Sequence, residues 1–179
     1  MSAPGTPLSS FAVSEPESFP NPIIRRSAMR KLNVVLANGS IEKKSAIDAG
    51  SGRYYELGAQ IRKAIFGYVI HAVLLRPIDG ENFVRTESEM AIKVYSKKIL
   101  RALQGKTQEN PLMEITALQF IGDEHPNIMG QIECCTDEEN IYSIMRFCRG
   151  GECLCDVCML PFLVCMLCIY VHVVIDCFC

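Results

Sequence analysis

The stretch Met90-Ala91-Ile92-Lys93-Val94-Tyr95 decides the fold of this chain. Its composition predicts a strand that presents Ala91, Lys93 and Tyr95 on one face and Ile92 and Val94 on the other. A lysine beside a small alanine on such a face needs an anionic partner, unless the strand lies at a sheet edge and the lysine points to water. Two partners are candidates: the carboxylate of Glu114, 21 positions further along the chain, and a bound phosphate.

Four more strands are predicted around this one, which itself extends over residues 89–96. Residues 54–61 and 68–75 have strand composition and a tight connection, and a turn at residues 77–82 follows them. Beyond the central strand, residues 128–136 and 141–147 form two strands joined by a short acidic hairpin loop.

One helix is inserted after the central strand. Asn110-Pro111 is typical helix-start chemistry, an N-cap followed by proline at the first helical position. The helix is predicted to end at Gly122 and to bury one apolar face, made of Leu112, Ile115, Leu118 and Ile121. The predicted class is therefore α+β: a five-stranded antiparallel sheet with one inserted helix, a disordered N-terminus and an apolar C-terminal helix.

The order and spacing of these segments resemble the small lobe of a eukaryotic protein kinase over residues 54–152. The resemblance is carried by the run Ile61 to Val69, Ala91-Ile92-Lys93, Glu114, His125-Pro126-Asn127-Ile128, and the run Ile141 to Glu152. The motif neighbourhood is similar to that of the calcium/calmodulin and related groups. It implies a Ser/Thr-directed kinase that uses ATP.

The resemblance also implies roles for individual residues. Lys93 would pair with the α and β phosphates, and Glu114 would hold Lys93 in place through an ion pair. Ala91 and Val69 would close over the adenine, Met145 would guard the back of its pocket, and the hinge backbone would bond the base. The implied ATP-binding residues are Ile61, Gly67, Val69, Ala91, Lys93, Glu114, Met145, Phe147 and Cys148; Arg146 stands where the family usually has an acidic residue.

The phosphate loop departs from the family pattern of three glycines. Arg62 and Ala64 replace the first two, and Gly67 keeps the third. Glycines let backbone amides approach phosphates without an intervening Cβ, so ATP binding is expected to be loose or altered.

The catalytic large lobe of the family has no counterpart in the sequence. The 27 residues after Glu152 contain neither a His-Arg-Asp nor an Asp-Phe-Gly motif, and His172 and Asp176 match neither. We therefore expect no catalytic base and no metal ligand in this chain, no held Mg²⁺, and a kinase domain that is truncated and inactive as written.

Composition divides the chain into three parts. Residues 1–50 are a Pro/Ser-rich and mixed leader, expected to be disordered at its start, in which Arg25-Arg26-Ser27 is predicted to be a solvated basic segment and Asn38-Gly39 a weak hairpin signal. Residues 51–152 are the kinase-like lobe. The net charge of −2 gives no electrostatic case for nucleic acid, and the start of the chain does not resemble an export signal, so a reducing cytoplasm is the expected location.

The third part, residues 153–179, holds seven of the ten cysteines and has three interpretations. Residues 157–175 have no charge and span about 28 Å as a helix, enough for a membrane anchor. The pairs Cys155/Cys158 and Cys165/Cys168 have zinc spacing. The abundance of residues with thymine-rich codons favours a translated intron.

Two functions follow from the sequence. The first is a protein Ser/Thr kinase family member that binds nucleotide. The second is a non-catalytic, membrane-anchored, pseudokinase-like module that binds a protein partner through the exposed face of the lobe.

Overall fold

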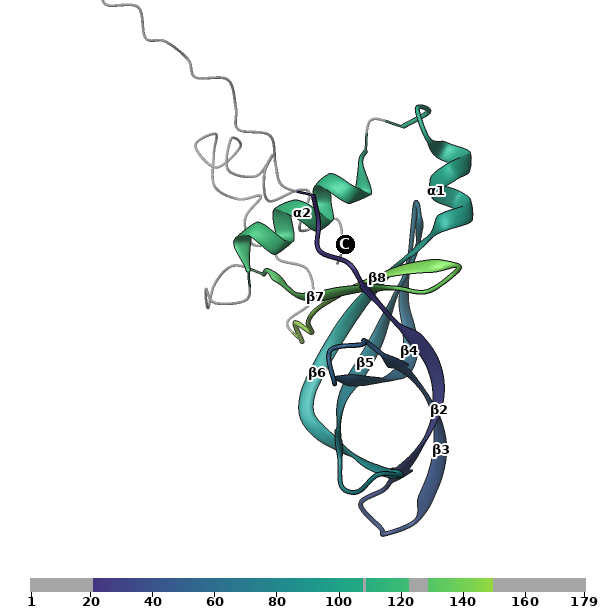
Figure 1. Cartoon of the computed structure of the whole chain (residues 1–179), viewed down its shortest axis with the longest axis vertical. Coiled ribbons are helices and arrows are strands. Elements are labelled where there is room, and N and C mark those ends of the chain that lie inside the picture. The colour runs from purple at the N-terminus through teal and green to yellow at the C-terminus, as the bar shows by residue number, and fades with distance from the viewer. Residues whose placement is uncertain (1–20, 108, 123–128, 150–179) are drawn as a thin grey trace, which may run out of the picture.

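The five predicted strands are present and form one antiparallel array. The computed structural model describes residues 21–107, 109–122 and 129–149 (Figure 1). The strands are β4 (Tyr54–Ala64), β5 (Gly67–Pro77), β6 (Asn82–Ser96), β7 (Gln131–Thr136) and β8 (Asn140–Arg146). Antiparallel pairing joins them in the order β7-β8-β6-β5-β4.

The sheet is closed rather than open, which corrects the prediction. Two strands from the supposed leader, β2 (Ala28–Val35) and β3 (Ile41–Asp48), form a hairpin. On one side β3 pairs with β4, and on the other β2 pairs in parallel with the start of β6. The strands β2, β3, β4, β5 and β6 therefore make a barrel, which occupies the lower half of Figure 1.

The basic segment predicted to be solvated is also ordered. Arg25–Arg26 form a short strand, β1, that pairs in parallel with β7. We predicted that residues 1–50 form a leader outside the folded lobe. This is wrong for residues 25–48, which form β1, β2 and β3 of the sheet. The Asn38-Gly39 signal was sound, because Gly39 has a φ of 82° in the turn between β2 and β3.

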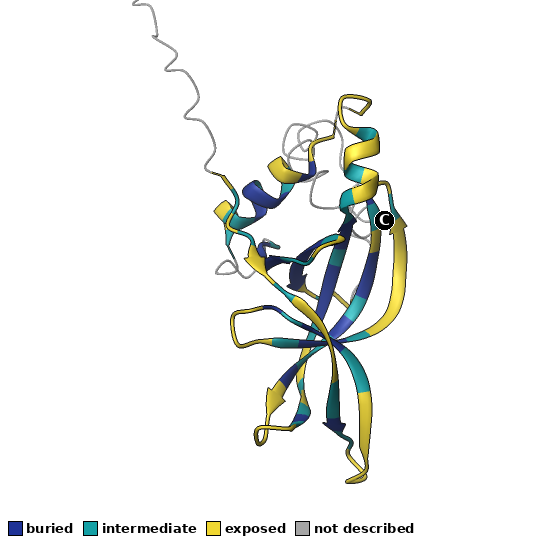
Figure 2. Ribbon diagram, turned by 45° about the vertical axis from the view of Figure 1, so that its right-hand side comes forward, coloured by how far each residue is buried: buried dark blue, intermediate teal, exposed yellow. Residues whose placement is uncertain are grey.

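The two faces of the central strand β6 pack in two different buried clusters, as its alternation predicts; Figure 2 shows the buried residues in dark blue. Ile92 and Val94 belong to one buried cluster, together with residues of β3, β4, β5, β7 and β8. Tyr95 lies on the opposite face, in a second cluster with Ile115 of the inserted helix. The face that carries Lys93 is therefore the one that the helix covers.

Two helices follow β6, one more than predicted. Helix α1 (Lys97–Leu103) buries no residue fully, although Leu100 and Leu103 pack against the cluster of Tyr95 and Ile115. Helix α2 (Pro111–Ile121) begins as predicted, because the Asn110 side chain accepts hydrogen bonds from the backbone N–H groups of Leu112 and Met113 at 3.1 and 3.4 Å.

The buried face of α2 differs from the prediction. Ile115 and Leu118 are buried, but Leu112 and Ile121 are exposed. A spacing of three residues turns a helix by 300°, so the predicted row drifts by about 60° per step. Only its middle pair can face the sheet.

In the described part of the chain no helix is long and apolar enough to span a membrane. The candidate anchor at residues 157–175, the cysteine pairs and the His125-Pro126-Asn127-Ile128 segment lie outside the described residues.

Candidate functional site

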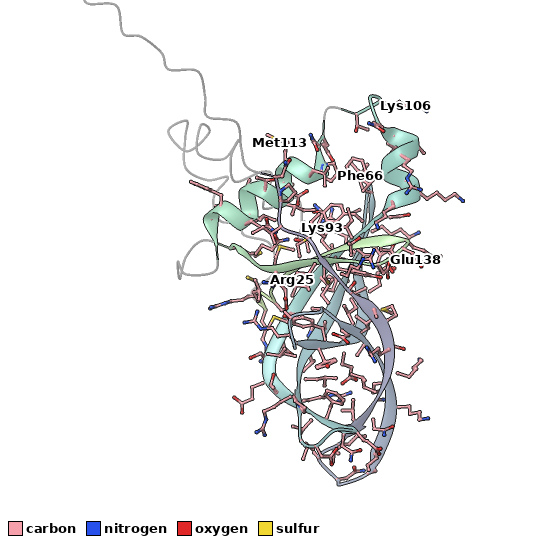
Figure 3. The ribbon with its side chains drawn as sticks, in the orientation of Figure 1. Arg25, Phe66, Lys93, Lys106, Met113 and Glu138 are labelled. Atoms are coloured by element: carbon pink, nitrogen blue, oxygen red, sulfur yellow. The ribbon has the colours of Figure 1, made fainter. Side chains whose placement is uncertain are left out.

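The ion pair expected between Lys93 and Glu114 is present in the structure. Lys93 Nζ donates to Glu114 Oε1 at 2.7 Å, and the two side chains are only 11% and 12% exposed. The Lys93 ammonium group also lies 5.2 Å from the centre of the Tyr95 ring. Figure 3 shows Lys93 between the sheet and α2.

Local structure explains why these two residues meet. The alternation of β6 directs Lys93 to the face covered by α2, and Glu114 lies in the first turn of that helix. A carboxylate there is favoured by the helix dipole. Because little water screens the pair, loss of either partner would leave a charge that is costly to bury.

The apolar residues assigned to the adenine lie next to this pair. Val69 pairs with Lys93 across β5 and β6, and Ala91 pairs with Met145 across β6 and β8. Directly opposed residues share a sheet face, so all four side chains point the same way. Val69, Ala91 and Met145 are at most 1% exposed. Ile61, by contrast, is 44% exposed where the β4–β5 pairing is irregular.

The segment predicted to form the phosphate loop is a tight hairpin. Pairing between β4 and β5 continues to Ala64 and Gly67, so only Ile65 and Phe66 form the turn. Phe66 is buried in the cluster of Tyr95 and Ile115, and its carbonyl accepts a hydrogen bond from the Ser96 N–H at 2.8 Å.

The structure shows why a glycine is needed at position 67, which the sequence did not reveal. A Cβ at Gly67 would lie 2.0 Å from the carbonyl oxygen of Val94 on the neighbouring strand. The glycine is therefore required by the close approach of two strands, whatever contact it makes with a phosphate.

The segment predicted to form the hinge follows β8 and contacts β5 and β6. The Phe147 N–H donates to the Glu89 carbonyl at 3.1 Å, and the Phe147 ring packs edge-on against His71 at a centroid distance of 4.9 Å. Arg149 Nε donates to the Glu89 carboxylate at 2.6 Å, and this bond lowers the pKa of Glu89. Cys148 between them is exposed.

Sequence reasoning missed a buried carboxylate in β7. Glu133 accepts a hydrogen bond from the Tyr55 hydroxyl. The pKa of Tyr55 is raised mainly by burial of the hydroxyl and, to a smaller extent, by this bond. The guanidinium groups of Arg25 and Arg53 lie 3.7 and 3.8 Å from the same carboxylate. A glutamate beside two cysteines in a strand-like run was a usable signal, because such a charge needs partners when it is buried.

A cavity of about 570 Å³ lies apart from the predicted nucleotide contacts. It opens between the tip of the β4–β5 hairpin, α1 and the start of α2. Its walls include Phe66, Leu100, Leu103, Pro111 and Ile141.

The fold and the site together describe a kinase-like region. A five-stranded antiparallel array with a helix after the third strand carries a lysine–glutamate pair between that strand and the helix. No family model matches the sequence. Curated relatives are calcium-dependent and related Ser/Thr protein kinases of plants and Plasmodium.

Three relatives illustrate this similarity. The chain is 28% identical over 84% of its length to calcium/calmodulin-dependent serine/threonine-protein kinase 1 of Oryza sativa subsp. japonica, and covers 27% of that protein. It is 26% identical over 86% of its length to CDPK-related kinase 1 of Arabidopsis thaliana, again covering 27%. A 64-residue stretch is 39% identical to calcium-dependent protein kinase 3 of Plasmodium yoelii yoelii, covering 36% of this chain and 11% of the relative. The chain thus spans about a quarter or less of these relatives.

Proposed function

We propose that the described region is the nucleotide-binding small lobe of a protein kinase of the Ser/Thr type. The observation that carries the proposal is the partly buried Lys93–Glu114 ion pair on the sheet face shared with Val69, Ala91 and Met145. The similarity to plant and Plasmodium Ser/Thr kinases supports it. In this reading Lys93 neutralises the α and β phosphates of ATP.

Each residue of the site has a separate task in the proposal. Glu114 holds the Lys93 ammonium group in one position, so that little side-chain freedom is lost when the phosphates arrive. Val69, Ala91 and Met145 supply an apolar surface for the adenine, beside Ile61. The backbone at Phe147 and Cys148 lies at the edge of that surface, where the base would be bonded.

The proposal assigns only binding and orientation to this region. In protein kinases the aspartate that accepts the substrate proton and the Mg²⁺ ligands belong to the catalytic and Asp-Phe-Gly loops. This region would hold the nucleotide against them.

Thermal unfolding of the full chain with ATP and Mg²⁺ tests the proposal. A ligand at about 100 times its Kd adds about 2.7 kcal/mol to the free energy of unfolding, which raises the midpoint by several degrees. Lys93→Met is expected to abolish this rise, measured against its own ATP-free baseline. Lys98→Met, on the exposed side of α1, is the matched control and should keep it. No rise at millimolar ATP in the unmodified chain would exclude nucleotide binding.

A second function is favoured by the hairpin. Arg62 and Ala64 stand in a regularly paired strand, and Gly67 is required by Val94. Both features suit a lobe that binds a protein without nucleotide. This alternative predicts no ATP effect but persistent binding of a partner protein to the Lys93→Met variant.

A further inference from the structure

Residues 23–27 lie as an extended peptide along α2 and the edge of β7. The Ile23 N–H donates to Gln119 Oε1 at 2.9 Å, and Gln119 Nε2 donates back to the Ile23 carbonyl at 2.7 Å. The Ser27 N–H donates to the Thr136 carbonyl at 2.8 Å. In Figure 1 the purple start of the ordered chain crosses α2 and then β7 before it enters β2.

Side chains reinforce the backbone contacts. Ile24 packs against the cluster that contains Ile115 of α2. Arg25 reaches to 3.7 Å from the buried Glu133 carboxylate. On the other side the chain passes so close to Gly50 that a Cβ there would lie 2.3 Å from the Arg26 carbonyl oxygen. The segment therefore contacts the helix on one side and Gly50, after β3, on the other, while the side chains of Ile23, Arg25 and Arg26 stay exposed.

Helix α2 needs such support. It has only 11 residues, and helices of this length depend on tertiary contacts for their stability. Much of its surface is exposed, including Met113 and Phe120. Gln119 lies on the same helix as Glu114, so the contacts that fix Gln119 also restrict movement of the Glu114 carboxylate relative to β6.

We propose that residues 23–27 are an intramolecular clamp that holds α2 against β7 and thereby positions Glu114 for its ion pair with Lys93. Gln119 is the positioning residue of this clamp. It bonds both backbone groups of one residue, so it holds an extended chain in the way that a neighbouring strand does. The consequence for ATP affinity rests on the proposed function.

Hydrogen exchange of the full chain, followed by mass spectrometry of its peptides, tests the clamp without nucleotide. Gln119→Ala removes both hydrogen bonds. Ile23→Pro removes only the bond donated by the backbone N–H of residue 23. Proline should be tolerated there because the Ile23 side chain is mostly exposed and residue 23 already follows Pro22. Gln119→Ala is expected to speed exchange in residues 23–27 and in α2 by about tenfold or more, and Ile23→Pro by about fivefold, with the rate in the barrel strands unchanged. Gln104→Ala, an exposed glutamine after α1, is the matched control.

The double variant shows whether Gln119→Ala and Ile23→Pro speed exchange by breaking the same contact or by two independent effects. Because both substitutions act on the same pair of bonds, Gln119→Ala with Ile23→Pro should exchange no faster than Gln119→Ala alone. Unchanged exchange in α2 of the Gln119→Ala variant would overturn the proposal, and so would fully additive effects.

ATP binding supplies the second measurement. Gln119→Ala is expected to weaken ATP affinity at least about threefold, because a smaller fraction of molecules holds Glu114 in place. In a Lys93→Met background the same substitution should change nothing further. Faster exchange with unchanged affinity would overturn the positioning role. If the unmodified chain binds no ATP, the proposed function fails, and the exchange experiment still decides whether the clamp holds α2.

Discussion

Replacement of Gly67 by alanine should destabilise the fold strongly in the absence of any nucleotide. The added Cβ would lie 2.0 Å from the Val94 carbonyl oxygen and 3.0 Å from its carbon. Both atoms belong to backbone, so neither can rotate away. Relief requires β5 and β6 to separate by about 1 Å, at a position where Gly67 pairs with Tyr95 and the Ser96 N–H bonds Phe66.

The magnitude follows from what this separation disrupts. Overpacking a rigid site costs about 1–3 kcal/mol, and each weakened backbone hydrogen bond adds about 1 kcal/mol. We expect the free energy of unfolding to fall by about 3 kcal/mol or more. For a domain of this size the thermal midpoint would fall by roughly 10 °C.

Gly80→Ala is the matched control for this measurement. Gly80 has no neighbouring atom within 4 Å of the added Cβ, and its φ is not positive. Thermal and urea unfolding of the full chain, followed by far-UV circular dichroism, would compare the two variants without ATP. If Gly67→Ala unfolds within about 0.5 kcal/mol of Gly80→Ala, the close strand approach is not what requires the glycine.

Two further predictions concern the helix start and the cysteines. Asn110→Ala should lower the free energy of unfolding by about 1 kcal/mol, because the α2 cap bonds are lost; an unchanged urea midpoint would contradict this. Peptide mass spectrometry should find Cys148 alkylated quickly at pH 8 and the buried thiols of Cys134 and Cys135 alkylated only on unfolding. Burial raises the pKa of each of these two thiols to about 12, so stability should fall as pH rises from 9 towards 12, where unfolded thiols ionise and folded ones do not. A Cys135→Ala variant should show a shallower fall.

The parts of the fold that local sequence specifies were predictable. The alternation along β6 placed Lys93 on one face with Ala91 and Tyr95, and Asn110-Pro111 marked the start of α2. In each case the signal lies within a few residues and acts through backbone geometry. The Lys93–Glu114 pair also needed the resemblance to protein kinase small lobes, because the strand face and the helix start left Glu114 as one of two candidate partners.

The barrel closure was not predictable in the same way. It depends on β2 meeting β6 in parallel through three residue pairs, from Asn33 with Asn82 to Val35 with Val84. Such a contact leaves no local pattern. The charged residues of β2 and β3, including Arg30, Lys31 and Lys44, further concealed two strands that bury only a few apolar side chains.

The interior position of Phe66 has a related explanation. Its cluster draws on β6, α2, β7 and β8, four elements that no single stretch of sequence brings together. A phenylalanine near a glycine in a turn predicts an exposed hairpin tip. Here the aromatic ring packs beneath α2, and the hairpin is attached to the same helix that carries Glu114.

The hairpin geometry determines how this site would attract phosphates under the proposed function. Pairing continues from Arg62 with Val69 to Ala64 with Gly67, so the amides that face β5 are committed to the ladder. A glycine-rich loop would instead offer its amides to the ligand. The attraction must then come mainly from side-chain charge, that of Lys93 held by Glu114 and that of Arg62 on the hairpin. Glu114 both positions the Lys93 ammonium group and neutralises part of its charge, and the clamp on α2 fixes Glu114. The clamp and the charge of Arg62 in the hairpin would therefore together set the affinity for ATP.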